Sequence, residues 1–499
     1  MSPGDSTRAA GRLSIKGWYG AAGLVALFTV GAIVECLHLA SLGNSAIWGH
    51  LRAGMWILEN KSFPRTGIFS QAADLPWRDF SWGYDAIVAV AYKLAGLRAI
   101  PLLAMAFRLI VTAVLFLLAG WRRRGRLLAA AALAMVGLYT LSGLGPASTG
   151  VSVVLIGIEL LLLLELREGR NSGVMYLLPV LFLTWANLDI GFVYGMIVLL
   201  VFVTSGFAMQ IAKAGEITED HSKLARNTAV VFATCLIVSG ITPYGFAGYA
   251  AFWQMETNPA NLVIPGYGAM GFRQPQDYVV LLLGMGAFLT MGLRRSRNVF
   301  LIALLCGSAA LAFYSQRENW LLIMSSIMVI GFTPSSADQI TAGITAARMF
   351  SYRSALIAGS TLAVAGLPFF VLIPRESSVL MGRVAETLPV KACDYIRSEH
   401  LPQPLFSAYE WGAFLTWYLP EYPVAIDGRR GLYPEELEND YFKVMKIDVP
   451  YQSLPAMKNA KTILLQKSNV LAGGLRNVPG FQVAYEDDVA IVLLQGAKE

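Results

Sequence analysis

The chain has 499 residues, of which 56% are hydrophobic and only 14% are charged, with a formal net charge of +6 and a mean hydropathy of +0.54. Soluble domains carry about 25% charged residues, so this composition excludes an ordinary soluble protein and indicates a polytopic membrane protein. The 4 cysteines and 4 histidines lie far apart, and the sequence has no Walker A loop or GxGxxG motif. These features argue against a disulfide framework, a common zinc motif and a nucleotide-binding enzyme.

The first apolar segment, residues 18–40, follows a tail that carries Arg8, Arg12 and Lys16. It has no small-residue cleavage site, so we interpret it as an uncleaved membrane span. Further apolar segments cover residues 100–120, 127–142, 150–166, 174–188, 191–212, 228–243, 277–293, 298–314, 318–333 and 354–374. The sequence therefore predicts a mainly α fold, a polytopic membrane helical bundle of about 11 spans within residues 1–374.

One more apolar segment, residues 80–97, decides the sidedness of all that follow it. Basic residues cluster in the loops at 121–126, 167–173, 213–227, 294–297 and 334–353. If residues 80–97 do not cross the membrane, all these loops and the N-terminus are cytoplasmic, as the positive-inside rule requires. We therefore expect residues 80–97 to form an interfacial or re-entrant helix within a long first outer loop, residues 41–99.

A second helix is predicted in the same loop, because Ile47, Leu51, Met55 and Leu58 recur at helical spacing. This pattern is typical of a helix that lies on the membrane surface. Such a helix could simply anchor the loop through tryptophans at the lipid headgroups, and periodicity alone favours that interpretation.

Residues 375–499 differ in composition, with 13 lysines and arginines against 16 acidic residues. The positive charge of the chain therefore lies in the membrane part, where it faces anionic lipid, and nothing indicates nucleic-acid binding. The patterns predict helices near 390–399, 411–418 and 435–446, an apolar run at 405–407, and strands at 424–426, 462–465, 481–485 and 489–494. Strands that alternate with helices predict a small extracytoplasmic α/β domain.

Short motifs with aromatic residues recur from about residue 40 to the C-terminus. The first outer loop reads WxHLRxGxWIL from Trp48 and PRTxxFS from Pro64, and Trp77 and Trp82 precede the apolar helix. Further along the chain come Trp185-Ala186-Asn187-Leu188, Pro243-Tyr244-Gly245, Glu410-Trp411-Gly412 and Ile426-Asp427-Gly428-Arg429-Arg430-Gly431-Leu432-Tyr433. In order and spacing, these motifs resemble bacterial membrane proteins of the GT-C glycosyltransferase type.

The resemblance implies a transferase that takes a sugar from a polyprenyl-phosphate donor and delivers it to an envelope glycan or lipid acceptor. It also implies a multi-pass protein of the bacterial inner membrane, with its N-terminus cytoplasmic and residues 375–499 extracytoplasmic. In that family a carboxylate takes the proton of the acceptor hydroxyl, and a basic residue or a divalent cation stabilises the departing lipid phosphate. The resemblance implies four phosphate-binding residues here, namely His50, Arg52, Arg65 and Arg317. The sequence offers no metal ligand set and identifies no cofactor, and the resemblance leaves a divalent cation open.

The sequence departs from the family pattern at its acidic positions. Relatives resemble the pattern DxDxWWHLR, whereas this chain has Asn44 and Ala46 in place of both carboxylates. Gly67 replaces the acid of PRTDxFS, Ser81 replaces the acid of W-x-x-H-E-W, and Asp189 replaces the histidine of WANLH. Because an asparagine cannot act as a general base at neutral pH, catalysis requires relocated carboxylates.

Three aspartates are candidates for the relocated base. Asp85 lies four residues after Ser81, one turn further along the same helical face, so it could replace the missing glutamate. Asp189 ends a span at the outer surface, and Asp79 precedes the interfacial helix. Each aspartate could instead cap a helix or pair with a nearby arginine, for which the sequence offers Arg78, Arg98 and Arg317.

Two other functions stay open. The loss of the acidic positions favours a catalytically inactive binding or scaffolding member of an envelope glycan assembly, although the basic residues are retained. Charges within spans, such as Glu159, could mark a transporter pathway, although the long first loop and the outer domain fit a transporter poorly. In the tail, Asp427, Arg429 and Arg430 could bind a phosphate or a glycan acid, or the aspartate and an arginine could pair to close a turn.

Overall fold

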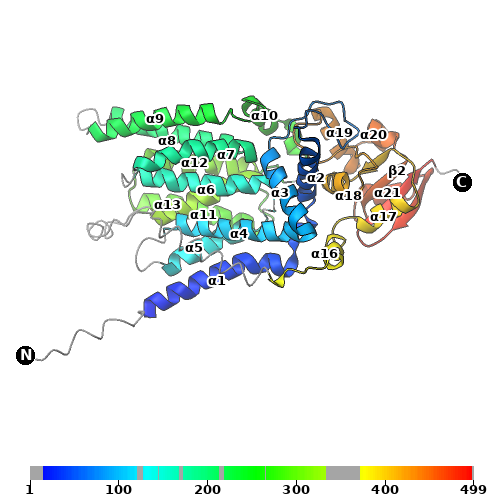
Figure 1. Ribbon diagram of the computed structural model, residues 1–499, viewed down its shortest axis with the longest axis horizontal. Coiled ribbons are helices and arrows are strands. Elements are labelled where there is room, and N and C mark those ends of the chain that lie inside the picture. Colours follow the sequence, from blue (N-terminus) through cyan, green and yellow to red (C-terminus); the bar gives the residue numbers. More distant parts are fainter. Residues whose placement is uncertain are drawn as a thin grey trace, which may run out of the picture.

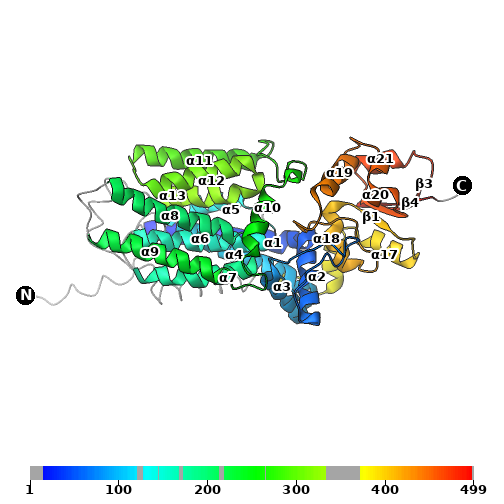
Figure 2. The same ribbon diagram turned by 90° about the horizontal axis from the view of Figure 1, so that it is seen from above.

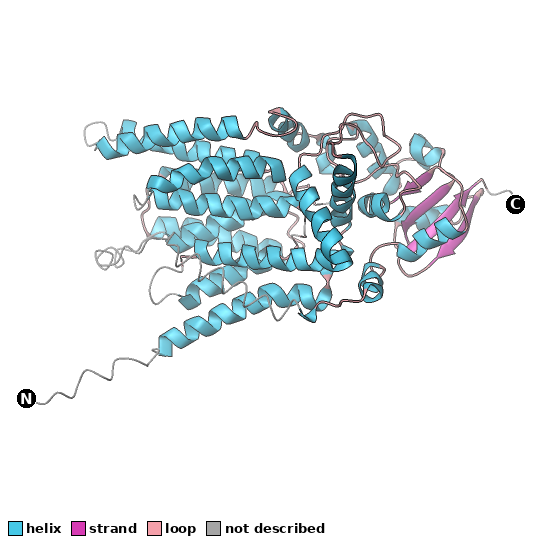
Figure 3. Ribbon diagram, viewed as in Figure 1, coloured by secondary structure: helices cyan, strands magenta, loops and turns pink. Residues whose placement is uncertain are grey.

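The computed structural model describes residues 15–120, 127–143, 145, 147–167, 172–212, 219–264, 266–332 and 371–496. A bundle of long helices forms one part, and a smaller unit with a sheet caps one end of it (Figures 1 and 3). The chain begins at the far end of the bundle and finishes in the smaller unit, as two perpendicular views agree (Figures 1 and 2).

The long helices of the bundle run side by side along its length (Figure 1). They are α1 (Ile15–His38), α4 (Ala99–Leu118), α5 (Leu127–Thr140), α6 (Ser148–Arg167), α7 (Leu177–Leu188), α8 (Phe192–Ala212), α9 (Glu219–Val238), α11 (Pro275–Leu293), α12 (Val299–Tyr314) and α13 (Asn319–Phe332). Most are apolar on all sides, and large apolar side chains such as Leu282, Leu289 and Leu293 face outward. Helices that are apolar all round are typical of membrane spans.

Each of these helices falls on a segment predicted as a span, and the remaining predicted span, 354–374, lies almost entirely outside the described residues. By length and composition, 4 helical stretches in the described part could cross a membrane: Trp82–Leu118, Ser148–Arg167, Phe192–Met209 and Pro275–Leu293. The apolar stretches of the other helices are shorter, so the span count stays a prediction. The first stretch combines two helices, which Gly96 separates with a φ of 58°.

Two helices of the first loop, α2 (Ser45–Asn60) and α3 (Trp82–Ala95), lie across the end of the bundle instead of along it (Figures 1 and 2). Asn44 begins α2, because its side-chain oxygen accepts a hydrogen bond of 2.9 Å from the Ala46 amide. Gly54 lets α3 approach closely, since a Cβ at this position would lie 1.9 Å from the Asp85 carbonyl oxygen. This crossing is the arrangement predicted for an interfacial helix over residues 80–97.

The smaller unit contains α16 (Ser377–Val384), α17 (Val390–Ser398), α18 (Tyr409–Tyr418), α19 (Glu435–Met445), α20 (Pro455–Lys458) and α21 (Val470–Leu475). Its strands β1 (Leu405–Ser407), β2 (Thr462–Gln466), β3 (Phe481–Glu486) and β4 (Ala490–Gln495) form one sheet in the order β1-β2-β4-β3. β1 and β2 are parallel, and the other pairs are antiparallel.

The predicted strand at 424–426 is wrong, because these residues join no strand of the sheet. Val424 forms a single bridge to Ser70 of the first loop, and its carbonyl accepts a bond of 2.9 Å from the Gln71 amide. The apolar segment is buried by contact with the first loop, which local pattern alone cannot reveal.

The smaller unit packs directly on α2. The ring of Trp48, fully buried, lies 4.4 Å from the Trp417 ring and 5.7 Å from the Phe414 ring between centroids. Ser45 Oγ accepts a hydrogen bond of 3.1 Å from the Phe414 amide. The first loop and the tail therefore share one apolar core, and the boundary at residue 375 stays a prediction.

The remaining described helices are short connections. They are η1 (Ala40–Gly43), η2 (Gly96–Arg98), η3 (Ser172–Tyr176), α10 (Ala247–Glu256), η4 (Pro259–Leu262), η5 (Gln316–Glu318) and η6 (Tyr451–Ser453). η5 and α10 matter for function, because they bring Arg317 and Glu256 to the end of the bundle that the smaller unit covers.

Candidate functional site

A cavity of about 320 Å³ lies where the end of the bundle, the first loop and the smaller unit meet. Its charged lining residues are His50, Arg78, Asp79, Asp85, Asp189, Arg317, Asp427, Arg429 and Arg430. Segments far apart in the sequence thus bring most of the predicted site residues into one space. We call it the central cavity.

The histidine of α2 contacts the aspartate in the first turn of α3. His50 Nδ1 lies 2.7 Å from Asp85 Oδ1, and the Tyr84 ring meets the imidazole edge to face at 5.0 Å. The Asp85 side chain is 3% exposed and that of His50 is 17% exposed, so the histidine is the more accessible member of the pair. Burial lowers the pKa of His50, although the negative charges of Asp79 and Asp189 act in the opposite direction.

A second carboxyl group lies beside this pair. Asp79 Oδ1 accepts bonds of 3.1 Å from the amide and the hydroxyl of Ser81, just before α3 begins. Burial, followed by the charge of Asp85, raises the pKa of Asp79 well above its usual range, and burial also raises that of Asp85. Since two close carboxyls cannot both ionise easily, Asp79 and Asp85 share one proton more readily than they lose both. Asp79 Oδ2 is buried and has no hydrogen-bond partner in the described part of the chain. We call His50, Asp79 and Asp85 the acid–histidine cluster.

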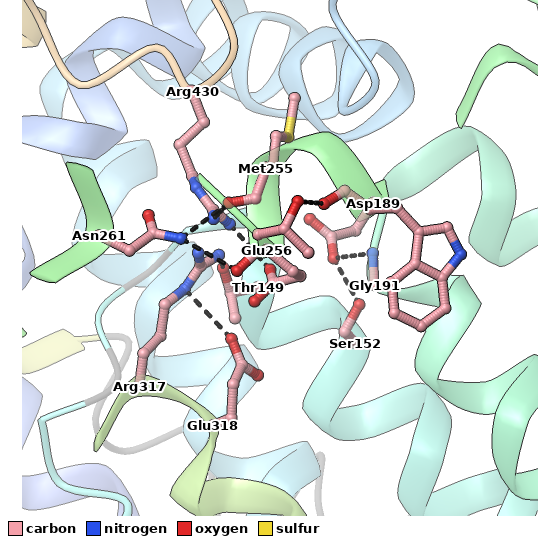
Figure 4. A network of polar contacts seen from close by, with 12 residues as sticks. Thr149, Ser152, Asp189, Gly191, Met255, Glu256, Asn261, Arg317, Glu318 and Arg430 are labelled. Carbon is pink, nitrogen blue, oxygen red and sulfur yellow. Dashed lines mark hydrogen bonds and ion pairs between the residues drawn. The ribbon is translucent and has the colours of Figure 1, made fainter. Parts of the chain in front are cut away.

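The third aspartate, Asp189, is tied to the ends of neighbouring helices. Its Oδ2 accepts hydrogen bonds from Ser152 Oγ at 2.5 Å and from the Gly191 amide at 2.8 Å (Figure 4). The Trp185 indole donates to the same Ser152 hydroxyl at 2.7 Å. Through these contacts Asp189 fixes the junction between α7 and α8, as the capping alternative expects. The residue also lines the central cavity.

Two arginines from different parts of the fold, Arg317 and Arg430, reach toward one another (Figure 4), and both contact the ring of Tyr267. Each guanidinium carbon lies 4.8 Å from the Tyr267 ring centroid, within the range of cation–π contacts. Arg430 donates to Glu256 Oε1 at 3.1 Å and to the Met255 carbonyl at 2.7 Å. We call Arg317, Arg430 and Tyr267 the arginine cluster.

Arg317 is less completely paired than Arg430. Its Nη2 donates to Thr149 Oγ1 at 3.4 Å, and its Nε lies 3.7 Å from Glu318 Oε1. Its Nη1 is buried and has no hydrogen-bond partner within the described residues. An unpartnered guanidinium donor in a cavity is well suited to bind an anionic oxygen.

The aspartate and first arginine of the Asp427–Arg430 segment pair with each other. Both carboxylate oxygens of Asp427 contact the guanidinium of Arg429 at 2.9 to 3.0 Å. Arg429 also donates to the Ile68 carbonyl and stacks 4.9 Å from the Trp77 ring. The turn-closing alternative thus fits Arg429, and this arginine also ties the smaller unit to the first loop.

Two predicted phosphate-binding residues do not line the central cavity. The Arg52 guanidinium lies 4.9 Å from the ring of Phe69, which does line it, and Arg52 Nε is buried without a hydrogen-bond partner in the described part of the chain. Arg65 is exposed on the loop, where its carbonyl accepts from the Trp77 amide.

Sequence reasoning missed Tyr267, Thr149, Ser152 and Glu256. Tyr267 lies in a loop, Glu256 ends α10, and Thr149 and Ser152 lie at the start of α6. None belongs to a motif, and only the fold brings them beside the predicted arginines and Asp189. Among the described residues, no group of three histidines, cysteines or acids is placed to hold a metal ion.

No family model and no curated protein sequence matches the chain. The fold itself defines a class: the chain has the fold of a GT-C glycosyltransferase, as its motifs suggest, and its apolar helices indicate a multi-pass membrane protein. One similar structure is ArnT from Cupriavidus metallidurans in the apo state, with a TM-score of 0.50 and 13% identity over 95% of this chain and 98% of that one. ArnT from Cupriavidus metallidurans bound to undecaprenyl phosphate has a TM-score of 0.47 and 13% identity, covering 96% and 98% of the two chains.

Proposed function

We propose that the protein is a membrane glycosyltransferase that transfers a sugar from a polyprenyl-phosphate donor to an envelope acceptor on the outer side of the membrane. One observation carries this proposal: a single cavity contains both a histidine–carboxylate pair and an incompletely paired arginine. The first can accept a proton from a hydroxyl, and the second can stabilise a departing phosphate. The GT-C fold supports the same class of reaction.

The donor phosphate binds at the arginine cluster. Arg317 Nη1 supplies the free donor, and its charge is only partly balanced by Glu318 at 3.7 Å. The cluster lies at the end of an apolar bundle, so a lipid chain can stay among the helices while its phosphate reaches the cavity. Arg52, whose guanidinium lies 4.9 Å from the Phe69 ring, adds positive charge near the cavity.

The acceptor proton goes to His50, and Asp85 positions the imidazole. With Nδ1–H donating to Asp85, the neutral ring offers Nε2 as a base, and Nε2 has no hydrogen-bond partner among the described residues. The lowered pKa of His50 keeps the ring in this basic form at neutral pH. The pair thus replaces the carboxylates that relatives have at positions 44 and 46.

The reaction is a single displacement. The acceptor oxygen forms a bond to the anomeric carbon, the bond from that carbon to the phosphate oxygen breaks, and the polyprenyl phosphate leaves with the electron pair. The proton of the acceptor hydroxyl moves to His50 Nε2, where the carboxylate of Asp85 stabilises the imidazolium. Asp79 and Asp189 lie close enough to favour that positive charge, and Asp189 is the second candidate for a base.

Deletion and complementation test the proposal. We expect deletion to remove one sugar from a surface glycan or lipid in the mass profile, and the wild-type chain but not His50→Gln to restore it. Asp488→Asn, an exposed carboxylate of the tail, is the matched control and should complement fully. An unchanged profile in the deletion strain would contradict an envelope-glycan role.

The alternative of an inactive binding protein has one specific observation in its favour. Arg429 and Arg430 are already paired with Asp427 and Glu256, so less positive charge is free for a phosphate than the sequence indicates. Suppose that deletion changes the glycan profile and that the deletion strain regains the wild-type profile with each of three variants, His50→Gln, Asp85→Asn and Asp189→Asn. The inactive binding protein then becomes the better account.

A further inference from the structure

A second hollow, which we call the seam groove, lies between the start of α2 and the smaller unit. Its volume is about 430 Å³, and its polar lining includes Asn44, Thr387, Tyr409, Glu410 and Gln466. None of these residues belongs to the acid–histidine or arginine clusters. The groove is more open than the central cavity, so a large molecule can enter from outside.

The polar groups of the seam groove are free to bind a ligand. Within the described residues, the side chains of Thr387, Glu410 and Gln466 make no hydrogen bond or ion pair, and the Tyr409 hydroxyl makes no hydrogen bond. Together they offer two hydroxyls, one amide and one carboxylate. Hydroxyl, amide and carboxylate groups are the partners that sugar hydroxyls need, because each sugar hydroxyl both donates and accepts.

The seam groove borders the central cavity near His50. Ala46, Ala413 and Gly428 line both spaces. Ala46 lies four residues before His50 on α2, which is one helical turn along the same face. Small residues lie close together at this border, since a Cβ at Gly49 would already lie 3.0 Å from the Ala413 methyl.

We propose that the seam groove is the acceptor subsite and that it takes the end of a neutral, polyhydroxylated glycan, whose terminal hydroxyl then meets His50 Nε2. This inference rests on the proposed transferase function and deepens it. Among the described residues that line the groove, Glu410 alone carries a charge, so an anionic headgroup is disfavoured there, whereas the arginines of the central cavity favour one. The donor and the acceptor therefore enter through chemically different openings.

Photocrosslinking in living cells tests the assignment and does not require the glycan to be identified first. The photoreactive residue p-benzoylphenylalanine replaces Thr387 in the full-length chain, and the control replaces Val483, which is exposed on the sheet away from the groove. We expect ultraviolet light to give a slower-migrating adduct at position 387 that stains for periodate-oxidised carbohydrate, and none at position 483. No adduct above the control, or an adduct that contains only peptide, would overturn the assignment.

Variants of the groove supply the second readout. Each loses hydrogen bonds to the acceptor, so we expect Gln466→Ala and Glu410→Gln to reduce the glycan product by about fivefold to tenfold each. If His50→Gln abolishes the product while both groove variants retain it fully and no carbohydrate adduct forms, only the acceptor subsite is wrong. If deletion of the protein leaves every glycan unchanged, the transferase and its acceptor subsite both fail.

Discussion

Gly54→Ala is expected to damage the site without touching any of its polar atoms. The new methyl carbon would lie 1.9 Å from the Asp85 carbonyl oxygen and 2.9 Å from the Ala89 methyl. Because a carbon atom needs about 3 Å or more from such an oxygen, α2 and α3 must separate locally by about 1 Å. Overpacking of this kind costs about 1–3 kcal/mol of stability.

The same displacement acts on the contact between His50 and Asp85, which now measures 2.7 Å. A shift of about 1 Å takes that contact beyond hydrogen-bond length, and misplacement of this size can reduce a reaction rate by about 100-fold. Product formation should therefore fall much further than protein abundance. The measurements are the amount of glycan product and the unfolding temperature of the detergent-purified protein.

Gly292→Ala is the matched control, because a Cβ at this helical position would meet nothing within 4 Å. It should leave both the product and the unfolding temperature at wild-type values, or raise the temperature slightly. If Gly54→Ala also behaves like the wild type in both measurements, the close approach of α2 and α3 does not set the geometry of the site.

The remaining predictions concern the charged groups and the sidedness. Arg317→Ala should reduce transfer by at least about tenfold, and Arg317→Lys should reduce it less, because lysine keeps the charge. Arg297→Ala, a change at an exposed arginine, should leave transfer unchanged. Equal activity of all three variants would exclude a phosphate role for Arg317. Burial raises the pKa of Asp79, so the stability that this group contributes is present below the usual aspartate pKa and is lost as pH rises through the raised value. The unfolding temperature of the Asp79→Asn variant should therefore depend less on pH on the alkaline side than that of the wild type. A parallel shift at every pH would contradict the shared proton. Because burial lowers the pKa of His50, transfer should fall with acid only as pH drops through that lowered value, below about 6.5, and His50→Gln should remove this dependence from any residual activity. An impermeant thiol reagent on intact cells should label single cysteines at the exposed Ser62 and Ser468 but not at Ser296, in a loop that the positive-inside rule predicts to be cytoplasmic. Labelling of Ser296→Cys would overturn the predicted topology.

Periodicity and composition predicted most of the helices and the α/β character of the tail. The apolar spacing from Ile47 to Leu58 predicted α2 correctly, because it depends on burial of one face of a helix. The continuous apolar run at 489–494 predicted β4, a strand whose first four residues are buried on both faces. The segment 424–426 was different. Its burial comes from the first loop, hundreds of residues away in the sequence, and no local rule encodes that contact.

The sequence predicted which residues form the site, but it did not predict which of them contact each other. The spacing from Ser81 correctly placed Asp85 in the first turn of α3, yet its contact with His50 depends on how α2 and α3 cross. The resemblance associated His50 with the donor phosphate, whereas its Nδ1 faces a carboxylate. Arg65 shows the opposite limit, because a basic residue in the right motif is exposed and lies outside the central cavity.

The amount of polyprenyl-phosphate-linked sugar in the membrane tests the central claim most directly. If the protein consumes such a donor through the His50–Asp85 pair, cells with Asp85→Asn should accumulate the donor and lose the modified glycan, as deletion does, while cells with Asp488→Asn keep wild-type amounts of both. Unchanged donor and glycan in cells with Asp85→Asn, at normal protein abundance, would contradict the account.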